Sequence, residues 1–401
     1  MPAHIDFFPV GCGDMTLITL ASGKTILIDI NIRKDADDNK KEEYPDVAVM
    51  LRSKLARDHK GRPYVDVFIL SHPDQDHCSG LRRHFHLGSP TLWREPEEGD
   101  NELIIIREMW SSPLTFRRVK EIEGSLCSDA EAWRGEAKRR VRLHKNNEGT
   151  ANDTGNLIRI MGRDKKDSKT EGVEHLILNV GESLTQIGNE GDGTFSALLL
   201  SPKAVNKEEA DNLSGKNNSS IVLKFSLASS ADSQDDVAKN PSARFLTGGD
   251  AEVYIWQRIW ERNQDQNSNL EYDVLQTPHH CSLGALSEDS YNGGGNKEAK
   301  GESCHIDEDA SSALSQARPQ AFIIGSSDAP MDSTGKDLAK RYYQKIAKDV
   351  QGRMLFTSMD SPQRPLRITI SDHGLEWAAS KPAIQAPKEK VGKGSTEKTY
   401  A

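Results

Sequence analysis

Residues 71–80, which read SHPDQDHCSG, place several metal-binding side-chain types on one short segment. Four of its residues are His or Asp and fall within six positions: His72, Asp74, Asp76 and His77. Imidazole nitrogen and carboxylate oxygen are the usual ligands of divalent metals. A polar loop that caps a strand is the alternative explanation. Side chains two residues apart on an extended turn point the same way, so one loop can supply two neighbouring metals.

Two later segments carry the same residue types at comparable places. Asp250 lies in FLTGGDAE, between an apolar run and a predicted helix, and His279 and His280 lie in VLQTPHHCS, after another apolar run. An Asp before a helix is usually only a cap, and a His pair alone often marks a polar loop. Taken together, and with Asp29 near the end of the early run ILIDI, these segments indicate a metal site assembled from distant parts of the chain.

The pattern H-x-D-x-D-H of residues 72–77 resembles the H-x-H-x-D-H loop of the metallo-β-lactamase fold. The order of segments is similar to that of the soluble metallo-β-lactamase domain of ComEC/Rec2 DNA-uptake proteins. Six segments between about residue 4 and about residue 377 carry this resemblance: VGCGDMTLITLASGKTILIDI, LSHPDQDHCSGL, LLLSP, NNSSIVLKF, LTGGDAE and TPHHCS.

The chain also departs from that family. Cys12 stands where the family usually has Gln, Asn31 where a Gly commonly follows the first-motif Asp, and Cys281 where a Gly follows the His pair. The late segment GSSDAPMDS lacks the family's Gly-His-Pro. No segment resembles the membrane channel of the uptake proteins. The resemblance therefore implies a hydrolase-like domain and does not imply transport.

The implied fold is α/β: the αββα sandwich of the metallo-β-lactamase type, in which two mixed β-sheets are flanked by helices. We expect this domain, with long polar insertions, to span residues 1–380. Residues 381–401 are Lys-rich and show no hydrophobic periodicity, which predicts a disordered tail.

The resemblance further implies two divalent metal ions. The first ion would take His72 and Asp74, with Asp250 as the bridge to the second. The second ion would take the remaining ligands: Asp76, His77 and His279. Zinc is the default metal, and manganese or magnesium is the alternative, because Asp74 makes the first site rich in oxygen.

Three other residues are candidates for a place beside the metals. Asn218 occupies the segment in which most of the superfamily has a third-motif His; the alternative is a turn before a strand. We expect Asp29 to orient a ligand rather than to bind metal directly. Asp14, in GCGD, could do the same for a ligand His, but we expect it to be a turn residue.

The implied function is that of a metal-dependent hydrolase, a phosphodiesterase or nuclease that uses a hydroxide activated by two metals. Asp76 would act at the catalytic centre. His280 would donate a proton to the leaving oxygen or hold the scissile phosphate, unless it only hydrogen-bonds a ligand. The expected substrate is a nucleic acid or nucleotide. Basic residues that could meet its backbone, or form a solvated face, are Arg82, Arg83, Lys138, Arg139, Arg140 and Arg142.

Two other classes of function stay open. The chain could be a small-molecule hydrolase acting on a lactone, a thioester or a cyclic nucleotide, which the net charge of −9 mildly favours. It could instead be a metal-stabilised subunit of a defence or toxin-like assembly, with a protein partner encoded alongside. The nearly complete ligand set argues against the hypothesis that this subunit role is the whole function.

Composition sets the broad class. The 401 residues are 35% hydrophobic and 28% charged, as in a globular chain with long polar loops. No apolar run approaches the roughly 18 residues of a membrane helix. The five cysteines are scattered, without a CxxC pair, which argues against a disulfide framework. The first residues lack a secretion-signal pattern, so we expect a cytoplasmic protein that does not bind membranes.

Hydrophobic patterning predicts the elements that must hold these side chains. Apolar runs predict strands at residues 5–10, 16–20, 25–30, 65–70, 103–112, 157–162, 175–180, 197–202, 220–225, 243–248, 321–327 and 366–371. Helical spacing predicts helices at residues 44–59, 128–145, 252–263 and 334–350. Each candidate ligand segment follows an apolar run, as in α/β proteins whose sites form at the C-terminal ends of strands.

Overall fold

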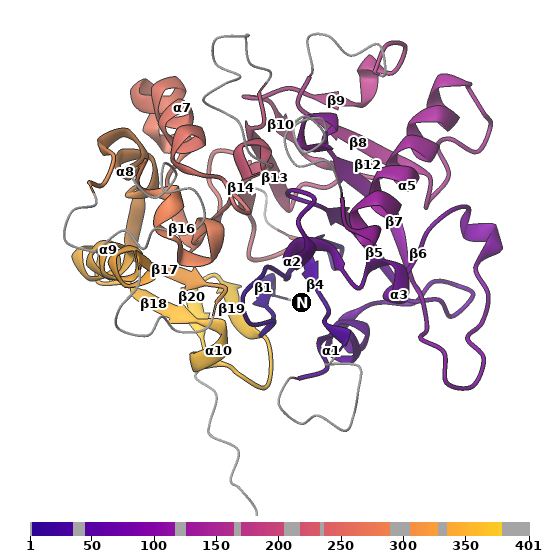
Figure 1. The fold of residues 1–401 in the computed structure, drawn as a ribbon, viewed down its shortest axis with the longest axis horizontal. Coiled ribbons are helices and arrows are strands. Elements are labelled where there is room, and N and C mark those ends of the chain that lie inside the picture. The colour runs from indigo at the N-terminus through magenta and orange to yellow at the C-terminus, as the bar shows by residue number, and fades with distance from the viewer. Residues whose placement is uncertain are drawn as a thin grey trace, which may run out of the picture.

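The computed structural model describes residues 2–34, 45–116, 126–163, 170–203, 217–232, 236–288, 305–327 and 335–378. Within them the chain forms two mixed β-sheets between two sets of helices (Figure 1). The expected α/β class with two mixed sheets flanked by helices is thereby confirmed. The proposed tail, 381–401, lies outside the described residues, so its disorder stays a prediction.

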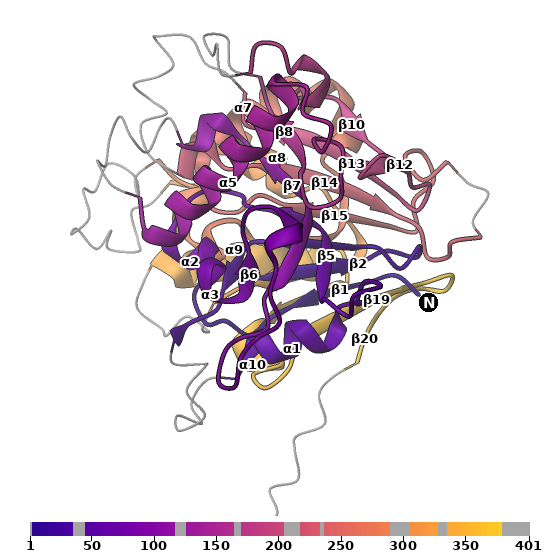
Figure 2. The ribbon, with the colours of Figure 1, turned by 90° about the vertical axis from the view of Figure 1, so that its right-hand side faces the viewer.

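The first sheet has ten strands in the order β20-β19-β1-β2-β3-β5-β7-β8-β9, with β6 beside β7. Its strands are β1 (His4–Phe7), β2 (Thr16–Thr19), β3 (Thr25–Ile28), β5 (Tyr64–Ile69), β6 (Phe85–His86), β7 (Ile104–Ser111), β8 (Leu157–Met161), β9 (Ile177–Leu178), β19 (Leu366–Ser371) and β20 (Gly374–Trp377). Neighbours from β20 to β3 are antiparallel, and those from β3 to β9 are parallel. β1 pairs with β19, so strands from both ends of the chain meet here (Figure 2).

The second sheet has seven strands in the order β10-β13-β14-β15-β16-β17-β18. Its strands are β10 (Ser183–Leu184), β13 (Phe195–Ser201), β14 (Val222–Leu227), β15 (Ala243–Thr247), β16 (Tyr272–Gln276), β17 (Ala317–Gly325) and β18 (Arg353–Phe356). The pairs from β15 to β18 are parallel. Two short strands, β11 (Gln186–Ile187) and β12 (Glu190–Gly191), pair separately, and β4 (Ile30–Asn31) makes isolated bridges to Cys78 and Ser79.

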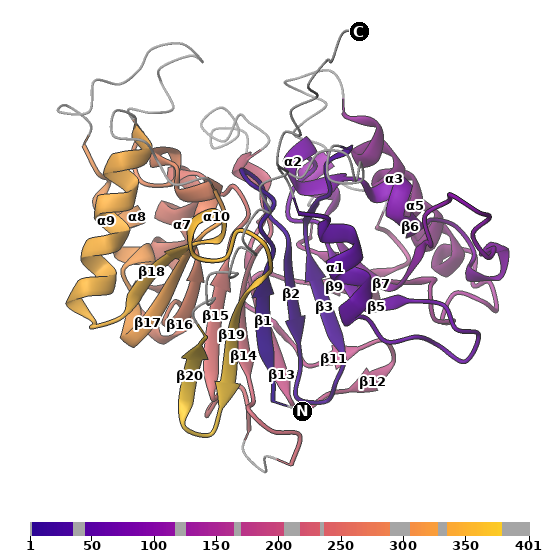
Figure 3. The same cartoon turned by 90° about the horizontal axis from the view of Figure 1, so that it is seen from below.

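Helices cover the outer face of each sheet (Figure 3). Those on the first sheet are α1 (Val47–Lys54), α2 (Gln75–Cys78), α3 (Leu81–His84) and α5 (Ser128–Lys145). Those on the second are α7 (Val253–Asn263), α8 (Glu308–Leu314) and α9 (Gly335–Asp349). The remaining short helices are α10 (Thr357–Asp360), η2 (Pro90–Leu92), η3 (Glu174–Leu176), η4 (Asn217–Ser219), η5 (Gln264–Asn269), η6 (Pro278–Cys281) and η7 (Leu283–Ala285).

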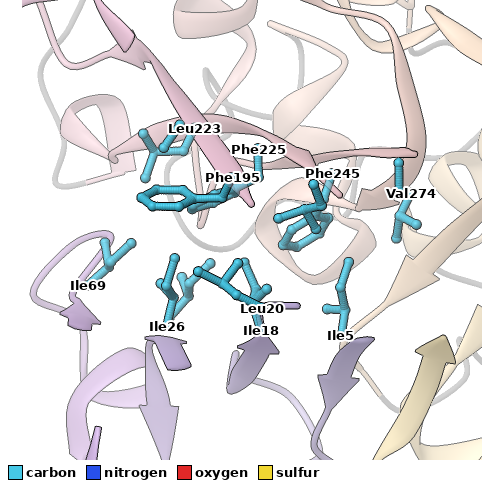
Figure 4. Close-up of a cluster of buried hydrophobic side chains, with 14 of the residues drawn as sticks. Ile5, Ile18, Leu20, Ile26, Ile69, Phe195, Leu223, Phe225, Phe245 and Val274 are labelled. Carbon is cyan, nitrogen blue, oxygen red and sulfur yellow. The ribbon is translucent and has the colours of Figure 1, made fainter. Parts of the chain in front are cut away.

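Apolar side chains between the two sheets form the central core (Figure 4). Those shown from the first sheet and its turns face those of the second: Ile5, Ile18, Leu20, Ile26 and Ile69 against Phe195, Leu223, Phe225, Phe245 and Val274. The predicted apolar stripe of α7 packs on the outer face of the second sheet through Val253, Trp256 and Ile259. Because both faces of each sheet are buried, the strand ends are held in place, and the candidate ligands lie in the segments that directly follow those ends.

Candidate metal centre

The candidate ligands meet where parallel strands of both sheets end. Asp29 follows β3, and the loop that carries His72 follows β5. From the second sheet, Asp250 follows β15, and His279 and His280 follow β16 in the short helix η6. The carboxyl ends of parallel strands are the usual place for sites in such sheets.

Asp250 stands at the centre of this group. Its Oδ1 lies 3.0 Å from Nε2 of His77 and 3.3 Å from Nε2 of His280. Its Oδ2 lies 3.6 Å from Nε2 of His72 and 3.7 Å from Nε2 of His279. One buried carboxylate therefore faces four imidazole rings, two with each oxygen.

Two further aspartates extend these two halves. On the Oδ1 side, Nε2 of His280 lies 3.3 Å from Oδ2 of Asp76 and 3.2 Å from Nε2 of His77. On the Oδ2 side, Nε2 of His72 lies 3.7 Å from Oδ2 of Asp74. We call the first half group A (Asp76, His77, His280 and Oδ1 of Asp250) and the second half group B (His72, Asp74, His279 and Oδ2 of Asp250).

The two adjacent histidines of η6 lie on opposite sides of Asp250. His279 was predicted to bind the same ion as Asp76 and His77, whereas in the structure His280 lies beside Asp76 and His77, and His279 lies with group B. The reason is the backbone: φ is 51° at both His279 and His280 and 65° at Cys281. Residues other than glycine rarely adopt this left-handed conformation, and here it turns the two rings 74° apart.

Buried carboxylates fix the orientation of the group A histidines. Asp29 Oδ2 lies 2.8 Å from Nδ1 of His77, and Asp29 also accepts from the backbone N–H of Ser71 at 2.7 Å. The predicted role of Asp29 in orienting a metal ligand stays a prediction. Asp14 was expected to be a turn residue. Instead its buried carboxylate lies 3.2 Å from Nδ1 of His280 and accepts from the Ser326 hydroxyl. Holding Nδ1 in this way directs Nε2 of each ring toward Asp250.

Glu252 is a candidate site residue that was not predicted from the sequence. Its carboxylate accepts from Nδ2 of Asn217 at 3.1 Å and from Nδ2 of Asn218 at 3.3 Å, and it lies 4.0 Å from Nδ1 of His279. Asn218 is buried and lies close to group B through this carboxylate. The Asp-x-Glu spacing of residues 250 and 252 after a strand was the available signal.

Charge and burial act against each other in this centre. Burial alone would lower the pKa of His77 and His280, but the Asp250 carboxylate, with Asp29 and Asp14, raises both pKa values well above the ordinary value. Burial would raise the pKa of Asp250, yet the facing imidazoles hold it well below its ordinary value. The metal-free group A is thus a cluster of imidazolium and carboxylate.

Burial dominates beside group B. It lowers the pKa of His279, and it raises the pKa of Glu252 to about 7. The histidines on the two sides of Asp250 therefore differ in proton affinity: it is raised for His77 and His280 and lowered for His279.

The chemistry of these donors fits a metal ion. Asp14, His77, Asp250 and His280 are buried, and each places one ligand atom within 4.8 Å of the others. These four residues, three of which belong to group A, could therefore hold a metal. Nε2 of His72 is buried and has no hydrogen-bond partner among the described residues, as expected of an atom that awaits a cation. Four ligands at about 2.0–2.1 Å from zinc lie about 3.3–3.4 Å apart. The distances between the donor atoms of group A given above, 3.0 to 3.3 Å, are close to that spacing.

A pocket of about 710 Å³ lies against group A. Asp76 lines it together with three cationic residues, Arg33, Lys34 and Arg83. Of the basic residues proposed from the sequence, Arg83 is therefore beside the centre, and Arg82 is exposed next to it.

The basic face of α5 is smaller than expected. Arg140 is buried and donates to the backbone carbonyls of Ile106 and Leu157, both at 2.9 Å, and Arg139 is paired with Glu136. These two arginines hold the helix on the sheet and are not available to a ligand. Lys138 and Arg142 remain exposed on α5.

The chain matches no known protein-family model, and the curated proteins contain no sequence similar to it. Two mixed sheets with parallel centres and a buried His/Asp cluster fit an α/β metallohydrolase-like fold. Among the helices of the described ranges, none is long and apolar enough to cross a membrane.

Proposed function

We propose that the chain is a metal-dependent hydrolase of the metallo-β-lactamase type, related to the ComEC-like domains, that cleaves phosphodiester bonds with two divalent ions. The observation that carries the proposal is the position of Asp250. Each of its oxygens faces two imidazole Nε2 atoms, with Asp76 on one side and Asp74 on the other. A carboxylate shared in this way by two sets of donors is the arrangement that a pair of ions needs.

The residues would divide as groups A and B do, with Asp250 as the bridging ligand. When bound, two divalent ions supply an activated water and neutralise charge on a phosphoryl oxygen. Asp29 and Asp14 keep the rings of His77 and His280 in the orientation that presents Nε2. His280 is then a ligand in this proposal rather than the proton donor that the sequence suggested.

Glu252 is the candidate for moving a proton at this centre. It is largely buried, its pKa is raised by burial to about 7, and it lies 4.0 Å from His279. A carboxyl group that titrates near neutral pH can give a proton to a leaving oxygen and take it back. Asn217 and Asn218 hold this carboxyl group in place through their side-chain amides.

The pocket beside group A supports a phosphate-containing substrate. Arg33, Lys34 and Arg83 line it, and among the lining residues that the structure describes the carboxylates are Asp76 and Asp129. Lactones and thioesters are neutral and gain little from three cations, whereas a nucleotide or nucleic acid carries a charge at every phosphate. The pocket therefore favours a nucleic acid or nucleotide over the other small-molecule substrates.

Purified protein incubated with single-stranded DNA, duplex DNA, RNA and a cyclic nucleotide, each with zinc, manganese or magnesium, tests the proposal. We expect metal-dependent cleavage of at least one of these substrates. Asp76→Asn and His77→Ala should abolish it, whereas Asp100→Asn, an exposed carboxylate elsewhere, should leave it unchanged. Failure of every substrate with fully metal-loaded protein would favour a non-enzymatic subunit of an assembly instead.

A further inference from the structure

Two cysteines connect the candidate metal-binding segment of residues 71–80, which we call the metal loop, to the long helix α5. Cys78 is the last residue of α2, directly after His77, and Cys127 is the N-cap of α5. Their sulfur atoms lie 3.5 Å apart, within hydrogen-bond distance. The described cysteines form no disulfide, so both are thiols in this arrangement.

The two thiols differ in their surroundings. Cys78 is buried, and its Sγ donates to the backbone carbonyl of Asp74 at 3.0 Å. Cys127 is only partly buried and lines the pocket that also contains Asp76. Small molecules that enter this pocket can therefore reach Cys127 but not Cys78.

Cys127 also has the environment of a nucleophilic thiol. Its Sγ accepts from the backbone N–H of Ala130 at 3.4 Å, at the N-terminus of an 18-residue helix, where negative charge is stabilised. The hydrogen bond with Cys78 lowers the pKa of Cys127 to about 6, against the effect of burial.

We propose that Cys127 and Cys78 form a redox modification site at which a peroxide oxidises Cys127 and Cys78 then closes an intramolecular disulfide. In the first step the Cys127 thiolate attacks the peroxide, an S–O bond forms, the O–O bond breaks, and one water leaves after protonation. In the second step the Cys78 sulfur attacks the sulfenic sulfur, the S–S bond forms, and the hydroxyl group leaves with the Cys78 proton as water. The peroxide is reduced to two waters, and two thiols become one disulfide.

Closing this disulfide would displace the metal loop. The sulfur atoms must approach from 3.5 Å to about 2.05 Å. The helix α2 has only four residues, and two of them are Asp76 and His77, so the movement of Cys78 is transmitted to group A. The closed disulfide also removes the proton that Cys78 donates to the Asp74 carbonyl. Oxidation should therefore weaken metal binding by about 10- to 100-fold, as loss of a ligand's supporting contact does.

Disulfide mapping of the full-length, metal-free protein tests the chemical step without any hydrolase activity. After stoichiometric hydrogen peroxide, alkylation and non-reducing digestion, we expect one linked peptide that contains Cys78 and Cys127. Cys78→Ser should leave a sulfenic acid on Cys127 that a dimedone probe traps. Cys12→Ser is the matched control, because Cys12 lines the same pocket, and it should not change the linkage. A disulfide between any other pair, or a reduced Cys78 beside an oxidised Cys127 in the wild type, would overturn the proposal.

Competition with a chromophoric zinc chelator tests the consequence. Oxidised wild-type protein should release zinc to the chelator at a 10- to 100-fold lower chelator concentration, and dithiothreitol should restore the reduced value. The Cys127→Ser variant should bind zinc like the reduced wild type before and after peroxide. Equal zinc affinity in oxidised and reduced wild-type protein would show that the cysteine pair does not control the metal centre. Neither measurement depends on which substrate the protein cleaves.

Discussion

Replacing Asp250 by Asn keeps the size of the side chain but removes the charge that four imidazoles share. Two of those rings, His77 and His280, have pKa values raised well above the ordinary value by this carboxylate. Breaking a buried ion pair by removing one partner costs about 3–5 kcal/mol. We therefore expect the free energy of unfolding of metal-free Asp250→Asn to fall by about that amount at pH 6.

The sign of the pH dependence follows from the direction of these shifts. A histidine whose pKa is raised by folding contributes stability that is fully present below about pH 6.5 and is lost as the pH rises through the folded pKa. The Asp250→Asn deficit should therefore be largest near pH 6 and shrink at higher pH. Urea unfolding of chelator-treated wild type and variant across this range measures it, and a deficit that does not change with pH would refute the reasoning.

Metal binding gives the second readout of the same substitution. Because Asp250 faces both groups, Asp250→Asn should weaken the binding of both ions, whereas Asp76→Asn should weaken only the binding of the ion at group A. Elemental analysis after dialysis against buffered zinc should give about two ions for the wild type and about one for Asp76→Asn. Asp66→Asn, a buried carboxylate bonded to Thr25 elsewhere in the first sheet, is the control and should retain both. Wild-type metal content in Asp250→Asn would refute its bridging position.

Three other outcomes follow from the site. Manganese should support activity at least as well as zinc, and Asp74→His should shift the preference toward zinc, as turnover against metal concentration would measure. In wild-type protein the metal-free form should lose thermal stability as the pH rises from about 6.5 through the raised pKa values of His77 and His280, whereas the zinc-loaded form should gain it, because zinc binds only neutral imidazole. For single-stranded DNA, the slope of the logarithm of the binding constant against the logarithm of the salt concentration should become shallower by about 0.7 in Lys34→Gln. The exposed control Lys60→Gln should leave this slope unchanged.

The strands beside the site could be predicted because their sequences leave little choice. Residues 65–69 are almost wholly apolar and make up all of β5 except Tyr64, and the strand is buried between its neighbours. Elements with weaker patterns were missed, such as α8 (EDASSAL), β18 (RMLF) and β20 (GLEW). Their four to seven residues lack a period of their own, and pairing or packing with distant segments decides their conformation. The predicted strand at residues 175–180 is reduced to Ile177–Leu178 for the same reason.

The residue types of the candidate site could also be predicted, but their pairing could not. Asp14 and His280 are 266 positions apart, and only the folded chain brings the carboxylate to Nδ1 of that ring. The division of His279 and His280 between the two groups depends on three successive left-handed residues, a conformation that non-glycine residues rarely adopt. A prediction from sequence assumes the common backbone conformation, and it therefore placed His279 with Asp76 and His77, where the structure has His280.

In the proposed metal centre, two buried carboxylates hold the rings of group A in place before metal binds. Asp29 and Asp14 hold Nδ1 of His77 and His280 from behind, and both carboxylates are buried in the protein. The ring directions are thus set by the fold before a metal arrives, and the cost of ordering them is met during folding. A metal ion then only has to displace the protons on Nε2 of His77 and His280. The raised pKa values of these rings oppose the loss of those protons. Affinity at group A should for this reason be governed by pH more than by any rearrangement of the chain.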